Sequence, residues 1–84
     1  MNSERSLLHV RAAKHAALGD PSRLLIVDLL TLGDLSPKEI AVSLDMPSNL
    51  VAHHLGVLES VAMVGRSRSE ADRRRSYVHL TPSA

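Results

Sequence analysis

The sequence predicts an α+β domain in which four short helices are followed by a two-stranded β-hairpin. Helix-start signals occur at Asp20, Ser36 and Ser48, and apolar residues recur with helical spacing as far as residue 62. After Gly65 the period changes from 3.6 toward 2, and this last segment contains half of the cationic side chains. Three short helices with an arginine-lined hairpin are typical of a winged helix-turn-helix.

Length and composition limit the possibilities. With 84 residues the chain is one small domain, whose marginal core would gain from a partner subunit or domain. The absence of cysteine excludes disulfides, thiolate ligands and cysteine nucleophiles, and is compatible with a reducing cytosol. No apolar run approaches the roughly 20 residues of a membrane helix, and the N-terminus lacks a signal-peptide core. We therefore expect a soluble, cytoplasmic domain without a membrane partner.

The first two predicted helices differ in their apolar pattern. The first runs from a cap at Ser3 to about Ala17, and its narrow stripe suits packing against another helix. That stripe consists of Leu7, Val10, Ala13, Lys14 and Ala17. The second is capped by Asp20, has Pro21 at its first position and stops at Gly33. Its apolar residues extend nearly all the way round, which predicts the most buried helix of the domain; they are Leu24, Leu25, Ile26, Val27, Leu29 and Leu30.

The next two helices form the predicted helix-turn-helix. Ser36, Pro37 and Glu39 make a complete capping box for the third helix. Residues 45–47 form the turn, and Ser48 is the expected cap of a fourth helix that runs to about Ala62.

The fourth helix has one apolar and one small, polar face. At 100° per residue the inward side contains Val51, His54, Leu55, Leu58 and Ala62, where His54 is interpreted as a packed core histidine. The outer side contains Asn49, Ala52, His53, Gly56 and Ser60 and carries no acid. Small, hydrogen-bonding residues suit a helix in the major groove of DNA. Simple capping by Ser48 and Asn49, and an idle surface histidine at 53, are the alternatives.

Charge is concentrated in the predicted hairpin, whose strands are 64–67 and 76–81. The overall charge is only +1, but residues 1–60 balance to −2 and residues 61–84 to +3. The five arginines are Arg66, Arg68, Arg73, Arg74 and Arg75. They form either a solvated hairpin or a patch that contacts phosphates. Tyr77 is the only aromatic residue, so a stacking platform for RNA or single strands is disfavoured and double-stranded DNA is the better partner.

Several of these residues carry a family resemblance. Residues 17–24 (ALGDPSRL), 40–41 and 51–55 (VAHHL) resemble the ArsR-type bacterial winged-helix repressors. The hairpin, with DRRR at 72–75 and HLTP at 79–82, resembles the MarR-type wing instead. Members of both groups regulate transcription as dimers, so the resemblance implies a dimeric, DNA-binding transcriptional repressor.

The resemblance also implies roles for individual residues. The positions that would face the major groove are Ser48, Asn49, Leu50, Ala52 and His53. Wing arginines, with Arg74 the best candidate, would approach the minor groove while Asp72 orients a neighbouring arginine. The first helix would contribute to a homodimer interface. The sequence departs from the family at Leu50 and Ala52, where Ser or Thr is frequent, and at Gly56, where Lys is frequent.

Other classes of site are not supported. The cysteines of metal-sensing relatives are absent, and the five histidines offer no ligand spacing, so we expect no metal and no cofactor. A catalytic set is also lacking, which disfavours an enzyme.

The expected organisation is a single domain, 1–84. It divides into a possible dimerising helix (1–18), a helical core (20–62) and a wing (63–81). Related repressors continue into another helix where this chain ends, so we hypothesise a covalent partner domain after Ala84, for example an arsenate reductase-like phosphatase. The alternative function is that of a winged-helix protein-interaction or regulatory domain of such a longer chain.

Overall fold

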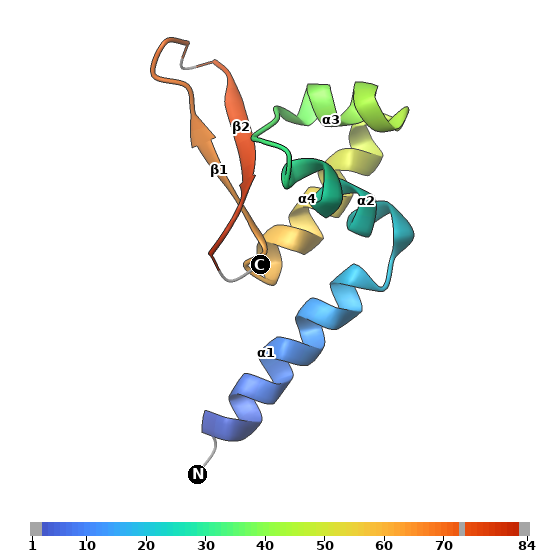
Figure 1. Ribbon diagram of the computed structural model, residues 1–84, viewed down its shortest axis with the longest axis vertical. Coiled ribbons are helices and arrows are strands. Elements are labelled where there is room, and N and C mark those ends of the chain that lie inside the picture. Colours follow the sequence, from blue (N-terminus) through green and yellow to red (C-terminus); the bar gives the residue numbers. More distant parts are fainter. Residues whose placement is uncertain (1–2, 73, 83–84) are drawn as a thin grey trace.

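A computed structural model describes residues 3–72 and 74–82 of the chain. Within these residues, four helices are followed by one antiparallel hairpin, as the sequence predicts (Figure 1). The elements are α1 (Ser3–Leu18), α2 (Pro21–Leu30), α3 (Pro37–Leu44), α4 (Ser48–Ser60), β1 (Val64–Arg68) and β2 (Ser76–Leu80). None of the described helices is long and apolar enough to cross a membrane.

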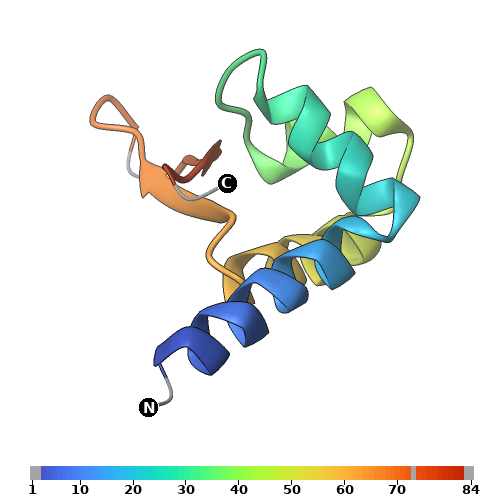
Figure 2. The same ribbon diagram turned by 60° about the horizontal axis from the view of Figure 1, so that its bottom comes forward.

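Helix α1 meets the rest of the domain only through its C-terminal part. Ala17 is buried, whereas residues 4–13 are exposed and extend away from the other helices (Figures 1 and 2). The apolar side chains of Leu7, Leu8 and Val10 are therefore open to solvent in the single chain. Such a face is unusual for a small domain on its own and suits a helix that packs against a partner.

Helix α2 begins as predicted, but its burial differs from the prediction. The Asp20 carboxylate accepts hydrogen bonds from the N–H groups of Ser22 (2.8 Å) and Arg23 (3.4 Å), with proline in the first turn. Only Ile26 and Leu30 of this helix are buried, so the prediction that α2 is the most buried helix is wrong. The neighbouring elements cover only the side that these two residues face. Helix α4 has the larger buried set, namely Val51, His54, Leu55 and Leu58.

The capping box of α3 is confirmed. The Ser36 N–H donates to Glu39 Oε1 (2.9 Å) and the Glu39 N–H donates to Ser36 Oγ (3.1 Å). The helix ends where Asp45 adopts a left-handed conformation (φ 52°), and the Met46 N–H then donates to the Ala41 carbonyl (2.9 Å). This turn directs the chain into α4.

Both predicted ends of α4 need correction. Pro47, rather than Ser48, occupies the N-cap position, and no side chain caps the first turn. The helix ends at Ser60 because Ala62 adopts a left-handed conformation (φ 59°), which allows the Met63 N–H to donate to the Leu58 carbonyl (3.0 Å). Ala62 is therefore exposed in a turn and does not belong to the buried face of the helix.

The hairpin is held against the helices by a third short segment. Strands β1 and β2 pair in register from Val64↔Leu80 to Arg68↔Ser76. Leu35, just before α3, forms an isolated antiparallel bridge with Val78, in which the two residues exchange hydrogen bonds of 3.2 and 2.7 Å. This bridge was not anticipated from the sequence. It fixes the start of α3 beside β2.

The core lies between the helices and the hairpin. Its fully buried members are Ile26, Ile40, Val51, Leu55, Leu58 and Val78, which come from α2, α3, α4 and β2. Because four elements contribute to one apolar cluster, the position of α4 depends on all of them.

Candidate nucleic-acid interface

The outer side of α4 is an exposed face of small and polar residues. Ser48, Asn49, Leu50, Ala52 and His53 are all exposed, whereas the side chains on the opposite side are buried. The division of the helix into two faces is therefore confirmed for these positions. An added Cβ at Gly56 would meet nothing within 4 Å, so this face is open at its middle. A partner surface can therefore approach the helix backbone closely.

The acid on the flank of this face is neutralised. Glu59 Oε1 accepts a hydrogen bond from Arg66 Nε at 2.7 Å, and both side chains are partly exposed. The contact ties β1 to α4 and so fixes the hairpin relative to the helix. It also means that the Arg66 side chain is held by Glu59 of α4.

The other wing arginines occupy different environments. Arg74 has 97% of its side chain exposed, while Asp72 Oδ1 accepts its backbone N–H at 3.0 Å and lies 3.8 Å from its Nε. Asp72 Oδ2 is 4.0 Å from Arg75 Nε, so this carboxylate contacts both arginines, as an orienting residue would. Arg68 is exposed at the end of β1. Arg73 lies outside the described residues.

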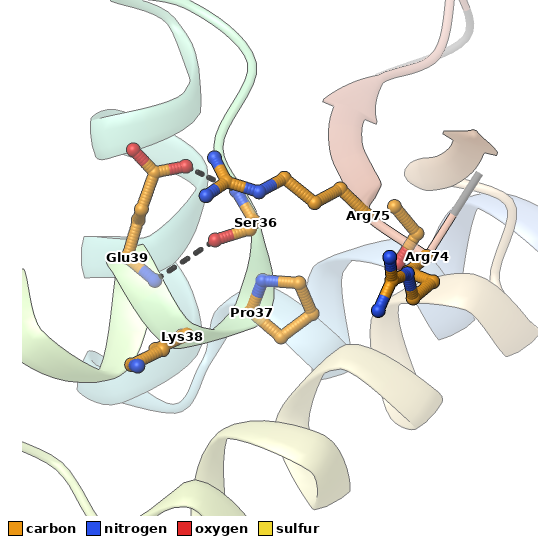
Figure 3. Close-up of a pocket in the computed structure, with 7 residues that line it drawn as sticks. Ser36, Pro37, Lys38, Glu39, Arg74 and Arg75 are labelled. Atoms are coloured by element: carbon orange, nitrogen blue, oxygen red, sulfur yellow. Dashed lines mark hydrogen bonds between the residues drawn. The ribbon is translucent and has the colours of Figure 1, made fainter. Parts of the chain in front are cut away.

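A hollow separates the start of β2, on the tip side of the wing, from the start of α3. Its volume is about 540 Å³, and it is lined by Ser36, Pro37, Lys38, Glu39, Arg74, Arg75 and Ser76 (Figure 3). Figure 3 shows the Arg75 side chain extending toward Glu39, whereas Arg74 points away from it. The hydrogen bond to Tyr77 and the nearby carboxylates of Asp72 and Glu39 raise the pKa of Arg75. The N–H and hydroxyl of Ser36, together with Arg75, hold the pKa of Glu39 below its usual value.

Sequence reasoning did not place Lys38 at this hollow. The sequence shows Lys38 only as the second residue of the third predicted helix. No local pattern relates it to arginines that are more than 30 residues away. The Leu35–Val78 bridge brings it there. We infer no separate role for Lys38, but it adds a cation to the surface beside the wing.

His54 is buried, as predicted, but its partner was missed. Its side chain is 5% exposed, and its Nδ1 lies 3.2 Å from Nη1 of Arg23 on α2. The Arg23 Nε also donates to the carbonyl of Ala17 at the end of α1 (2.7 Å). A partner for His54 could have been expected from the sequence, because a buried histidine needs a hydrogen-bond partner. The sequence does not show which polar residue supplies it.

Within residues 3–72 and 74–82, no group of three histidine, aspartate or glutamate side chains is arranged to hold a metal ion.

The helix α3, the turn at 45–47, the exposed helix α4 and the paired hairpin together define a winged helix-turn-helix. Residues 20–64 match the family model described as "Bacterial regulatory protein, arsR family". This match covers more than half of the chain. The chain therefore belongs to the ArsR family of bacterial regulatory proteins.

Individual relatives agree with this assignment. The transcriptional repressor SdpR of Bacillus subtilis (strain 168) is 33% identical over 52 residues, which are 62% of this chain and 58% of SdpR. The chain thus spans little more than half the length of that relative. The homodimeric winged helix-turn-helix DNA-binding domain of Mb0332 from Mycobacterium bovis, a possible ArsR-family transcriptional regulator, is 26% identical with a TM-score of 0.87. The similarity covers 99% of this chain and 74% of the Mb0332 fragment.

A more distant structure shares the fold. HlyU from Vibrio cholerae is 17% identical, with a TM-score of 0.82 over 99% of this chain and 84% of the HlyU chain. Because that comparison includes α1, the similarity extends beyond the residues that match the family model.

Proposed function

We propose that the domain regulates transcription by binding double-stranded DNA, with α4 in the major groove and the wing beside it. The observation that carries this proposal is the exposed, acid-free outer side of α4, whose only flanking acid is paired with Arg66. A helix that approaches base edges must avoid repelling the phosphates on either side of the groove. The SdpR and Mb0332 relatives support the proposal.

The residues of α4 can take different roles in such a complex. Asn49 has both a donor and an acceptor and suits an adenine edge, and Ser48 suits a phosphate near the start of the helix. His53 can donate to a base or to a phosphate. Leu50 and Ala52 are apolar, so they suit close approach and contact with a thymine methyl group.

In the wing, Arg74 is the residue best placed to reach a groove or phosphate, because its side chain is almost fully exposed while Asp72 holds its backbone. We assign the supporting phosphate contacts to Arg68, Arg73 and Arg75, and we assign Arg66 to the edge of the interface because Glu59 restrains it. Arginine suits these contacts because its planar group can bind phosphate through two hydrogen bonds.

Replacing Arg74 with alanine should weaken binding to all duplexes and reduce the salt dependence of the affinity. The slope of log K against log salt should become less steep by about 0.9 for the lost phosphate contact. Asn49→Ala is the matched comparison, because it should lower affinity mainly for duplexes that carry the preferred base pair. Both are measured by fluorescence anisotropy with duplexes selected from random DNA.

One outcome of that experiment would contradict the proposal. If the parent domain shows no binding to any duplex at low salt, the surface serves a different partner, and a protein-docking domain becomes the better interpretation. The exposed apolar side chains of Leu32 (86%) and Val42 (75%) are the observation that favours this second candidate.

We further propose that two copies associate through α1. The exposed Leu7, Leu8 and Val10 provide an apolar surface on a helix that projects from the domain (Figure 1), and the Mb0332 domain is described as homodimeric. Two copies would present two α4 helices to successive major grooves, which suits a two-fold symmetric operator.

Replacing Leu7 with glutamate should shift the protein toward monomers, because a symmetric interface would contain the new carboxylate twice. We expect dimer dissociation to become easier by at least about tenfold. Sedimentation equilibrium measures the change. His9→Glu is the matched control, since it adds the same charge about 160° around the helix from Leu7 and about 100° from both Leu8 and Val10. Equal effects of both substitutions would contradict an interface on the Leu7 side.

A further inference from the structure

One polar contact joins the end of α1 to the middle of α4. The Arg23 guanidinium uses Nε to bind the Ala17 carbonyl (2.7 Å) and Nη1 to contact His54 Nδ1 (3.2 Å). Arg23 lies in the first turn of α2, and its side chain is only 16% exposed. One side chain therefore connects three helices. These include the helix proposed to form the dimer and the helix proposed to read DNA.

The chemistry of this contact defines the state of His54. A guanidinium has only donors, so Nδ1 of the imidazole must be the acceptor. His54 must then be neutral, with its proton on Nε2. If a second proton binds to Nδ1, the acceptor is lost and two cations lie 3.2 Å apart within the domain. Arginine cannot relieve this repulsion by giving up its own proton.

We propose that Arg23 is a positioning residue that holds α4 against α1 through neutral His54, and that protonation of His54 releases this hold and weakens DNA binding. The inference rests on the proposed function of α4. Its consequence is that the domain binds DNA less tightly once acid adds a second proton to His54 and breaks the contact with Arg23.

The groups around His54 are consistent with this effect. On its own helix the neighbour is His53, with ring centroids 5.5 Å apart. From the start of α2 come Arg23 and Asp20, and α1 contributes the Ala17 carbonyl that Arg23 binds.

Asp20 is the one nearby anion, and it is already engaged. Its carboxylate accepts the N–H groups of Ser22 and Arg23 and lies 3.9 Å from the Arg23 guanidinium. Burial acts to raise its pKa, but those N–H groups and the Arg23 guanidinium outweigh burial and hold the pKa below its usual value. Asp20 therefore stays ionised throughout the histidine range, and an acid response there does not come from this carboxylate.

The test uses the whole 84-residue chain and a duplex that the parent selects from random DNA at about pH 8. Affinity is measured at about pH 8 and about pH 5.5 at one salt concentration, and circular dichroism confirms folding at both. We expect the parent to lose about tenfold in affinity in acid, which corresponds to about 1.4 kcal/mol. His54→Asn places an amide oxygen near the Nδ1 position and does not titrate, so its affinity should change less than about threefold.

Two further variants test whether the acid response is specific to His54 and whether the contact needs the guanidinium shape of Arg23. His15→Asn removes an exposed histidine from α1, so it should retain the full acid response of the parent. Arg23→Lys keeps the cation but cannot bind both acceptors with one planar group, so its binding should be weaker at both pH values and change little between them.

A nuclear magnetic resonance measurement of the histidine ring nitrogens tests the contact without DNA. At about pH 8 His54 should carry its proton on Nε2 alone. A proton on Nδ1 would overturn the inference whatever the DNA result, and so would an equal acid loss in the parent and His54→Asn. If His54→Asn does not fold, the ring nitrogens and Arg23→Lys decide the question. Absence of DNA binding at about pH 8, with the expected tautomer present, would instead reject the proposed function of α4.

Discussion

Replacing Ala52 with glutamate is expected to abolish DNA binding while leaving the domain folded. Ala52 is exposed on the outer side of α4, and glutamate is a good helix former, so the helix itself should tolerate the change. In the proposed complex the new carboxylate would lie between two rows of phosphates, where like charges cost several kcal/mol. We expect the affinity to fall by at least about 100-fold at physiological salt.

Ala52→Gln is the matched control for this prediction, because the two side chains have almost the same size and differ in charge. The glutamine variant should bind within about tenfold of the parent, since an amide can donate and accept in the groove. Fluorescence anisotropy with the selected duplex measures both affinities. Binding of Ala52→Glu at the strength of the parent would show that this side of α4 does not face DNA.

Replacing Leu55 with alanine is expected to have the largest effect on stability. Leu55 is completely buried on the inner side of α4, in the cluster that also contains Ile26, Ile40 and Val78. Truncation of a buried leucine costs about 2–5 kcal/mol, because transfer free energy is lost and a cavity is left behind. A domain of this size has a free energy of unfolding of about 4–13 kcal/mol, so the variant should lose a large part of it.

Leu32→Ala is the control that shares the residue type. Leu32 is 86% exposed in the turn after α2, so its removal should change the free energy of unfolding by less than about 0.5 kcal/mol. Urea unfolding followed by circular dichroism compares the two variants with the parent. Equal losses from both would mean that the core is not centred on α4.

These two tests address the two sides of the same helix, and the sequence predicted that division correctly. The spacing of Val51, His54, Leu55 and Leu58 gave the inner side, and the absence of acids gave the outer side. The ends of the helix were harder to predict. Ser48 has the usual chemistry of an N-cap, but the chain places Pro47 at that position. Ala62 adopts a left-handed conformation that its residue type does not favour.

The site could be predicted only in part from the sequence. Exposure of Asn49, Ala52 and His53 followed from helical periodicity, whereas Ser48 and Leu50 were assigned through the family resemblance. The cluster of arginines was visible in the sequence itself. The environment of each arginine was not visible. Arg66 is paired with Glu59, Arg75 extends toward Glu39, and Arg74 is exposed. These differences depend on the register of the hairpin and on the position of α3 beside it, which the sequence does not show.

The sequence by itself determined the features that depend on near neighbours in the chain. The Asp20 cap, the Ser36–Glu39 capping box and the change of period at the hairpin each require only a few residues, so local chemistry decides them.

The tertiary structure alone decided which apolar residues of α2 are covered, that Leu35 pairs with Val78, and that Arg23 meets His54 across 31 residues. These features depend on how whole elements pack against one another. Hydrophobic burial drives that packing and has no preferred direction, so a periodic pattern shows which residues can be buried but not which neighbours bury them.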